Sequence, residues 1–162
     1  MRIFSLFALV SCLLLTSALA EPVIFLVRHA ERATISGRVP SDTGLSEAGR
    51  ARAESLARAL RAAQITAIYT SEFKRTQETA APLAKLLGLR SEIVPADDLK
   101  GLVAKLKAQP GNALVVGHSN TLPQILNALG VSTRVAVPES DYDNLFLIEL
   151  GRPPHFTHLH YR

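Results

Sequence analysis

The stretch VIFLVRHAER, residues 23–32, joins an apolar run to a strongly polar end. Five consecutive apolar residues lead directly into Arg28 and His29, and a run of this length is typical of a fully buried strand. Strands of this kind belong to parallel sheets that helices cover on both sides. The pattern therefore predicts a strand that fixes a guanidinium and an imidazole at the edge of a buried sheet.

The sequence that follows alternates between helical and strand patterns. Apolar periodicity predicts helices over residues 45–63, 72–88, 97–108 and 119–130, and strands over residues 22–27, 65–71, 91–95, 112–118, 144–150 and 155–161. This alternation predicts an α/β fold, a three-layer sandwich in which helices cover both faces of a mostly parallel central sheet.

Three local signals define details of the predicted helices. Ser46 is expected to cap the first helix, and Gly88 is expected to end the second. Pro82 lies inside the second helix and is expected to kink or split it. The face of the first helix that should be buried carries Gly49, Ala53, Leu56, Ala57 and Leu60.

The first twenty residues have the pattern of a secretory signal peptide. A basic start, an apolar run over residues 3–15 and the A-x-A site at residues 18–20 predict cleavage after Ala20. Residues 21–162 would then form a single domain. Its net charge would be +3, because Arg2 is lost from a chain of net charge +4. The protein is therefore expected to be secreted, with the periplasm as its compartment and no membrane attachment after cleavage.

A second processing pattern overlaps the first. Residues 9–12, LVSC, resemble a bacterial lipoprotein box, which leaves lipidation of Cys12 as an alternative. Cys12 is the only cysteine, so cleavage after Ala20 would leave a chain without a disulfide. Stability would then depend on the hydrophobic core, and about 140 residues are enough to form one.

The composition argues against nucleic acid as a partner. The positive charge is small, no long Lys/Arg block occurs, and only 6% of the residues are aromatic and available for base stacking. The surplus of basic residues favours small anionic substrates instead.

Basic side chains follow three of the predicted strands. Arg28 and His29 end the first strand, Arg75 comes shortly after the second, and His118 ends the fourth. Ligands of open parallel sheets bind beyond the carboxyl ends of the strands, where these side chains should meet. Guanidinium groups match phosphate oxygens, and all four side chains can donate hydrogen bonds to an anion. The sequence therefore predicts a phosphate pocket.

Two predicted helix starts would add to this pocket. Helices that begin at Ser71 and Ser119 would direct free backbone N–H groups and the positive end of the helix dipole toward the bound anion.

Three segments resemble the signatures of the histidine phosphatase superfamily, which includes the phosphoglycerate mutases. They are LVRHAE at residues 26–31, TSEFKRTQETA at residues 70–80 and VVGHSN at residues 115–120. Residues 42–57 resemble the segment that links the first two. The resemblance covers nearly all of the chain after the signal peptide, and it implies the phosphoglycerate mutase-like fold in a small secreted phosphatase.

The resemblance also implies a role for each matching residue. His29 would be the nucleophile that takes the phosphoryl group, and Arg28, Arg75 and His118 would bind the phosphate oxygens. The implied activity is hydrolysis of a phosphomonoester on a small phosphorylated substrate or a phosphoprotein, with neither a metal nor another cofactor. Ala30 departs from the family pattern, which has glycine there, and would be strained if that position required a positive φ.

The general acid is the least defined part of this prediction. A leaving alkoxide needs a proton, and many relatives supply an acidic residue after the third strand. Asp97 is the first choice here and Asp98 the next. Both have an ordinary structural alternative, with Asp97 capping the next helix and Asp98 in its first turn.

Other features allow competing interpretations. A metal site at His155, His158 and His160 has no nearby partner ligand, so structural or surface roles are expected for them. Residues 139–144, ESDYDN, are expected to form a solvated loop or to line the pocket. A non-catalytic protein that binds phosphorylated ligands stays an alternative, as does a serine hydrolase with Ser119, Asp141 and His158 as its triad. Substrate and oligomeric state stay open, and residues 32–43 and 131–144 are the expected variable loops.

Overall fold

The computed structural model describes residues 21–34 and 41–161. The predicted signal peptide, Cys12 and part of the first variable loop lie outside the described residues. The strands are β1 (Val23–Arg28), β2 (Ile65–Thr70), β3 (Ser91–Ile93), β4 (Asn112–Gly117), β5 (Asn144–Glu149) and β6 (His155–His160), and the helices are α1 (Glu47–Leu60), α2 (Lys74–Leu87), α3 (Leu99–Ala108) and α4 (Leu122–Ala128).

The strands form one six-stranded sheet in the order β3-β2-β4-β1-β5-β6. The first four strands of this order run parallel, while β5 and β6 close the sheet in antiparallel pairs. Strand β1, whose residues from Ile24 to Arg28 are all buried, lies between β4 and β5. This arrangement confirms the predicted α/β class and the mostly parallel sheet.

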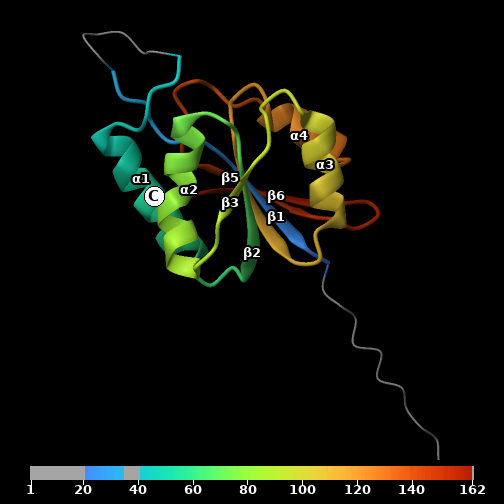
Figure 1. Ribbon diagram of the computed structural model, residues 1–162. Helices are drawn as coiled ribbons and strands as arrows, with labels where there is room; N and C mark the ends of the chain where they lie inside the picture. Colours follow the sequence, from blue (N-terminus) through green and yellow to red (C-terminus); the bar gives the residue numbers. More distant parts are fainter. Residues whose placement is uncertain (1–20, 35–40, 162) are drawn as a thin grey trace, which may run out of the picture.

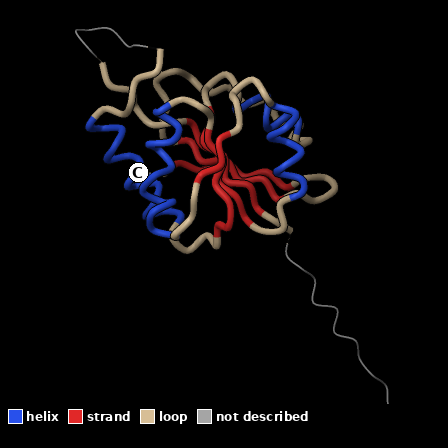
Figure 2. Tube along the Cα trace, viewed as in Figure 1, coloured by secondary structure: helices blue, strands red, loops and turns tan. Residues whose placement is uncertain are grey.

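Helices cover both faces of the sheet. In Figure 1, α1 and α2 pack side by side on one face, and α3 and α4 lie on the other. Two hydrophobic clusters fill the spaces between the layers, one around Phe146 and Leu26 and one around Leu56 and Leu83. The connections that follow β1, β2 and β4 gather at the upper end of the sheet in Figure 2. That end is where the predicted pocket should lie.

Helix α1 agrees with its sequence pattern. The Ser46 hydroxyl accepts a hydrogen bond from the backbone N–H of Gly49 at 3.0 Å, which confirms the predicted cap. The buried residues of the helix are the five that the pattern placed on one face. Gly88 ends α2 with a φ of 66°, a left-handed conformation that glycine adopts without strain.

The expectation that Pro82 splits the second helix is wrong. Helix α2 continues from Lys74 to Leu87 with Pro82 inside it. Thr79, Ala80 and Leu83 around this position are fully buried against α1 and the sheet. Tertiary packing therefore outweighs the hydrogen bond that proline cannot donate.

Two other predicted helix starts are also corrected. The helices expected to begin at Ser71 and Ser119 begin at Lys74 and Leu122, because extended or turn residues come first. The cap of α3 is Asp98 and not Asp97, since the Asp98 carboxylate accepts from Gly101 N at 2.8 Å. Within residues 21–34 and 41–161, no helix has the length and hydropathy required to span a bilayer.

Candidate active site

The sheet brings the two histidines of the signatures together. Arg28 pairs with Gly117 in the register of the parallel strands β1 and β4, so His29 and His118 follow adjacent strand ends. The His29 backbone N–H donates to the Gly117 carbonyl at 2.9 Å, and the two imidazole centroids are 5.4 Å apart. Two residues that are 89 positions apart in sequence thus form one pair because their strands are neighbours.

His29 is buried and has one ring nitrogen occupied. Its Nδ1 donates to the Ala30 carbonyl at 2.8 Å, which leaves Nε2 as the nitrogen with a free lone pair. Burial, together with the nearby charges of Arg28 and Arg75 and the imidazole of His118, lowers the pKa of His29 to about 3, although the Ala30 hydrogen bond opposes the shift. His29 is therefore neutral at pH 7 and able to act as a nucleophile.

Ala30 occupies its place without strain. Among the described residues, Gln64 is the one residue other than glycine with a positive φ. The Ala30 side chain is fully buried, and its backbone N–H donates to the Thr79 hydroxyl at 2.9 Å. The glycine of the family pattern is not required in this chain.

Arg28 is almost completely buried and is surrounded by residues 138–142. Its Nη1 donates to the carbonyls of Pro138, Glu139 and Asp141 at 2.8–3.3 Å. The guanidinium also lies 4.2 Å from the centre of the Tyr142 ring. Its Nη2 donates to the Glu139 carboxylate at 2.6 Å, while its buried Nε has no partner among the described residues.

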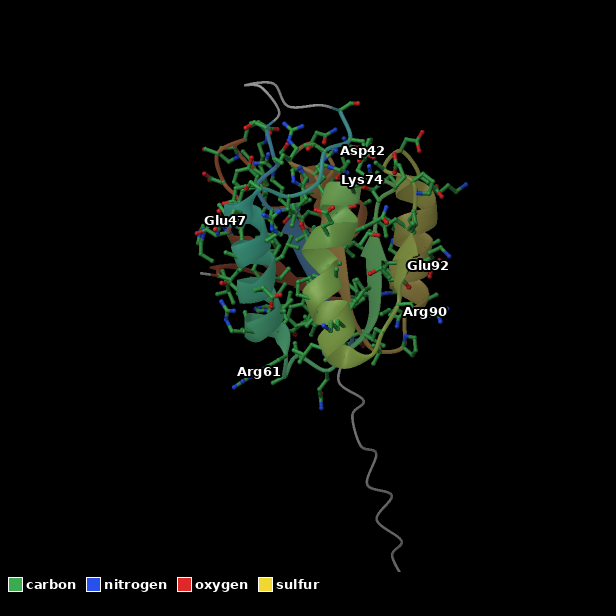
Figure 3. All side chains as sticks on the ribbon, turned by 60° about the vertical axis from the view of Figure 1, so that its left-hand side comes forward. Asp42, Glu47, Arg61, Lys74, Arg90 and Glu92 are labelled. Carbon is green, nitrogen blue, oxygen red and sulfur yellow. The ribbon has the colours of Figure 1, made fainter. Side chains whose placement is uncertain are left out.

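Arg75 approaches the histidines from the first turn of α2. Its Nη1 donates to the Ser41 carbonyl at 2.9 Å, and its Nη2 lies 3.4 Å from Nδ1 of His118. Burial, and then the positive charge of Arg32, lower the pKa of Arg75. The segment around Ser41 is fixed in turn, since Lys74 N donates to Asp42 at 2.9 Å, and the two labelled side chains lie close together in Figure 3.

His118 is buried between Arg75 and Ser71. Its Nδ1 accepts from Arg75, because a guanidinium can only donate, so its Nε2 carries the proton and donates to the Ser71 hydroxyl at 3.0 Å. Burial, followed by the charge of Arg75, lowers the pKa of His118 to about 4. Two neutral imidazoles and two guanidiniums therefore face one another at this end of the sheet.

A cleft of about 610 Å³ opens over His29, Arg75 and His118, whereas Arg28 is buried and contacts the cleft lining through Glu139. Its lining includes His29, Arg75, His118 and Asp97, so Asp97 faces the predicted phosphate site. Asp98 caps α3 and is not part of this lining. The capping role that the sequence left open for Asp97 thus belongs to its neighbour, and the Asp97 carboxylate is exposed beside the cleft.

Two further residues of the cleft were not predicted as site residues. Glu139 bonds both Arg28 and Ser119 through its two oxygens, which realises the pocket-lining alternative for the loop at 139–144. Arg32, two residues after the RHA motif, lines the cleft together with Arg75. The cluster of acids at 139–144 was the signal for Glu139, but only the fold places it against Arg28.

The competing interpretations find little support in the geometry. Among the described residues, the Ser119 hydroxyl bonds Glu139, while His158 bonds Asn144 at 2.7 Å, so these two residues do not form a Ser–His pair. No group of three or more His, Cys, Asp or Glu side chains in the described part of the chain could hold a metal ion. His160 bonds Asp143 at 3.0 Å on the exposed surface of β6.

Comparisons with known proteins agree with the sequence signatures. Residues 24–101 match the family model of the histidine phosphatase superfamily (branch 1). The chain is 31% identical over 133 residues to the "Probable phosphoglycerate mutase GpmB" of Yersinia enterocolitica, across 80% of this chain and 58% of that protein. It is 39% identical over 79 residues to the PE-PGRS family protein PE_PGRS11 of Mycobacterium tuberculosis, across 45% of this chain and 13% of that protein. The chain thus spans less than two thirds of either relative.

The fold is also shared with solved structures. The protein histidine phosphatase SixA complexed with tungstate superimposes with a TM-score of 0.70 at 18% identity, across 85% of this chain and 96% of that chain. The superposition extends well beyond the residues that match the family model, so the likeness includes the strands and helices on both sides of the cleft. The match of the family model over residues 24–101, together with the likeness to the probable phosphoglycerate mutase, places the chain in the histidine phosphatase superfamily.

Proposed function

We propose that this protein is a phosphomonoester hydrolase that acts outside the cytoplasm through a phosphohistidine at His29. One observation carries the proposal. His29 and His118 lie 5.4 Å apart beside two buried guanidiniums, at the end of the sheet where Nε2 of His29 is free. This arrangement suits a nucleophile facing a dianion, because two guanidiniums beside a neutral imidazole supply the donors and the positive charge that a bound phosphate requires.

The first step forms the covalent intermediate. Nε2 of His29 attacks phosphorus, and the bond between phosphorus and the leaving oxygen breaks. Arg28 and Arg75 bind the equatorial oxygens, whose charge is spread in the transition state. When Arg75 Nη2 turns from Nδ1 of His118 to the phosphate, the Ser71 hydroxyl can donate to Nε2, and Nδ1 can carry the proton and donate to a phosphate oxygen.

The general acid completes this step. In the proposal, Asp97 donates its proton to the leaving oxygen, since its carboxyl group borders the cleft that holds His29. In the second step water attacks phosphorus, the bond to Nε2 breaks, and Asp97 takes the proton from water. Inorganic phosphate and the neutral histidine are the products, and neither step uses a metal ion.

The proposed substrate is a small phosphorylated molecule or a phosphoprotein. The names of similar proteins include both kinds, since one structural neighbour is called a protein histidine phosphatase and another a mycobacterial glucosyl-3-phosphoglycerate phosphatase. The proposed export rests on residues 1–20, and the proposed single domain is residues 21–162.

The test compares two histidine variants on a chromogenic phosphomonoester in the presence of a chelator. His29→Ala should lower phosphate release by more than about a thousandfold, while His158→Ala should stay within twofold of the wild type. Rapid quenching in alkali should trap a phosphorylated wild-type protein and no phosphorylated His29→Ala.

Three results would contradict the proposal. They are turnover by His29→Ala, loss of activity with the chelator, and phosphate binding by the wild type without any turnover. The last result would select the non-catalytic binding protein. Esterase activity that Ser119→Ala abolishes would select the serine hydrolase.

A further inference from the structure

We propose that the Glu139 carboxylate competes with phosphate for Arg28 and thereby promotes release of the phosphate product. The inference rests on the proposed function, since it assigns Arg28 to the phosphate. It begins from a contact that the phosphate-binding role does not explain, the hydrogen bond of 2.6 Å from Arg28 Nη2 to Glu139 Oε2.

The donors of Arg28 divide into two groups. Nη1 is occupied by three carbonyls of residues 138–141, so it binds the loop. Nε and Nη2 form the other edge of the guanidinium, a fork that matches two oxygens of one anion. Nε is buried without a partner among the described residues, and Nη2 bonds Glu139. A phosphate that satisfied this fork would take the place of the Glu139 carboxylate.

Glu139 can leave Arg28 without moving the loop. Its side chain is 73% exposed, although Arg28 is 1% exposed. The backbone of residues 138–141 stays bound to Nη1, and the Tyr142 ring stacks on the guanidinium at 4.2 Å. Rotation of one exposed side chain is therefore sufficient for the exchange.

Glu139 also competes with phosphate through its negative charge. The hydrogen bond from Ser119 and the charges of Arg28 and Arg32 lower its pKa, so it is an anion at neutral pH. A carboxylate and a phosphate dianion on one guanidinium repel each other, and occupancy by one disfavours the other. After the phosphohistidine is hydrolysed, two guanidiniums still bind the product. The return of Glu139 to Arg28 would weaken that binding and shorten the lifetime of the product complex.

The experiment measures binding of inorganic phosphate by calorimetry to the wild type, Glu139→Gln and Glu92→Gln. Gln can still accept a hydrogen bond from Arg28 but carries no charge. We expect Glu139→Gln to bind phosphate about fivefold more tightly, which is the size of a partly exposed ion pair. The inhibition constant of phosphate during turnover should fall by the same factor. Glu92→Gln, which removes an equal charge from an exposed pair with Lys105 outside the cleft, should match the wild type.

A second variant tests the inference independently in case Glu139→Gln does not fold. Ser119→Ala removes the hydroxyl that bonds the other Glu139 oxygen, and it should also tighten phosphate binding, by a smaller factor. Weaker or unchanged phosphate binding in folded Glu139→Gln and Ser119→Ala would overturn the inference and assign Glu139 to positioning Arg28. A wild-type protein that binds no phosphate would overturn the proposed function as well. The titration of the wild type therefore distinguishes failure of the proposed function from failure of the Glu139 inference alone.

Discussion

Two pairs of histidines lie at similar separations in this protein and have different surroundings. The rings of His29 and His118 are 5.4 Å apart at the cleft, and those of His158 and His160 are 4.9 Å apart on β6. The first pair is buried beside Arg28 and Arg75. The second pair is exposed and bonds the side chains of Asn144 and Asp143.

The difference appears in the protonation of the rings. Burial and neighbouring guanidiniums lower the pKa of His29 to about 3 and that of His118 to about 4. On β6 burial lowers the pKa of His158 and an adjacent imidazole adds to the shift, but no cation takes part. Both regions therefore contain two imidazoles close together. Of the two, the cleft alone adds guanidinium groups and an opening through which an anion can reach the rings.

The largest expected effect is a difference in catalytic activity between variants of the two histidine pairs. His118→Ala should lower kcat/KM by about 10²–10³-fold, because it removes a donor to the developing charge on phosphate. His158→Ala is the matched variant and should change kcat/KM by less than twofold. Steady-state kinetics on one phosphomonoester decides the matter, and equal losses in both variants would remove the distinction between the pairs.

The same reasoning applies to two adjacent carboxylates. Asp97 borders the cleft and Asp98 caps α3, so Asp97→Asn should lower kcat about 10²-fold on an alkyl phosphate, whose leaving group needs a proton. On an aryl phosphate with a good leaving group the loss should nearly vanish.

Asp98→Asn is the control, since asparagine caps helices about as well as aspartate. It should leave both rates near the wild type. An unchanged rate for Asp97→Asn on the alkyl ester would refute its assignment as the acid and leave His29 unaffected.

A third prediction concerns stability. Below pH 6.5 the unfolded chain protonates His29 and His118, whereas the folded protein keeps them neutral down to about pH 3 and about 4. The unfolded state then binds more protons, so the free energy of unfolding falls as the pH falls through this window. Between pH 7 and pH 5 each histidine should account for about 2 kcal/mol of the loss.

Urea denaturation at the two pH values measures this effect. His118→Gln should lose about 2 kcal/mol less than the wild type on acidification. Identical losses in the two proteins would mean that His118 is not buried as a neutral ring.

The smallest expected effect is on β6. His160→Ala removes an exposed pair with Asp143, and such pairs contribute about 0.2–1 kcal/mol. Thermal denaturation should show a shift of this size, with unchanged phosphatase activity. A loss of activity would mean that the exposed pair has a function that its surroundings do not indicate.

Local sequence patterns were sufficient for the fold and for much of the site. The apolar run before Arg28, the helical spacing of α1 and the cap at Ser46 depend on neighbouring residues, and all three agree with the structure. Pro82 did not follow its local preference, because burial of the surrounding helix face outweighs one missing hydrogen bond.

Contacts made by the irregular loops could not be predicted. Glu139 meets Arg28 from 111 residues away, and the path of residues 131–143 follows no periodic pattern. The exchange of capping roles between Asp97 and Asp98 is a shift of one residue, which is within the ordinary uncertainty of a helix boundary. The sequence signatures thus identified the basic side chains of the site, while the geometry of the loops determines that Asp97 and Glu139 are the carboxylates beside them.

The bonds from Arg28 to the carbonyls of residues 138–141 have a consequence for synthesis. A polypeptide that ends before Pro138 contains His29, His118, Arg28 and Arg75, but the Arg28 guanidinium lacks its carbonyl acceptors. A chain whose synthesis has not yet reached Pro138 should therefore lack the proposed hydrolase activity, which should arise only when residues 138–161 have been added and have joined the sheet.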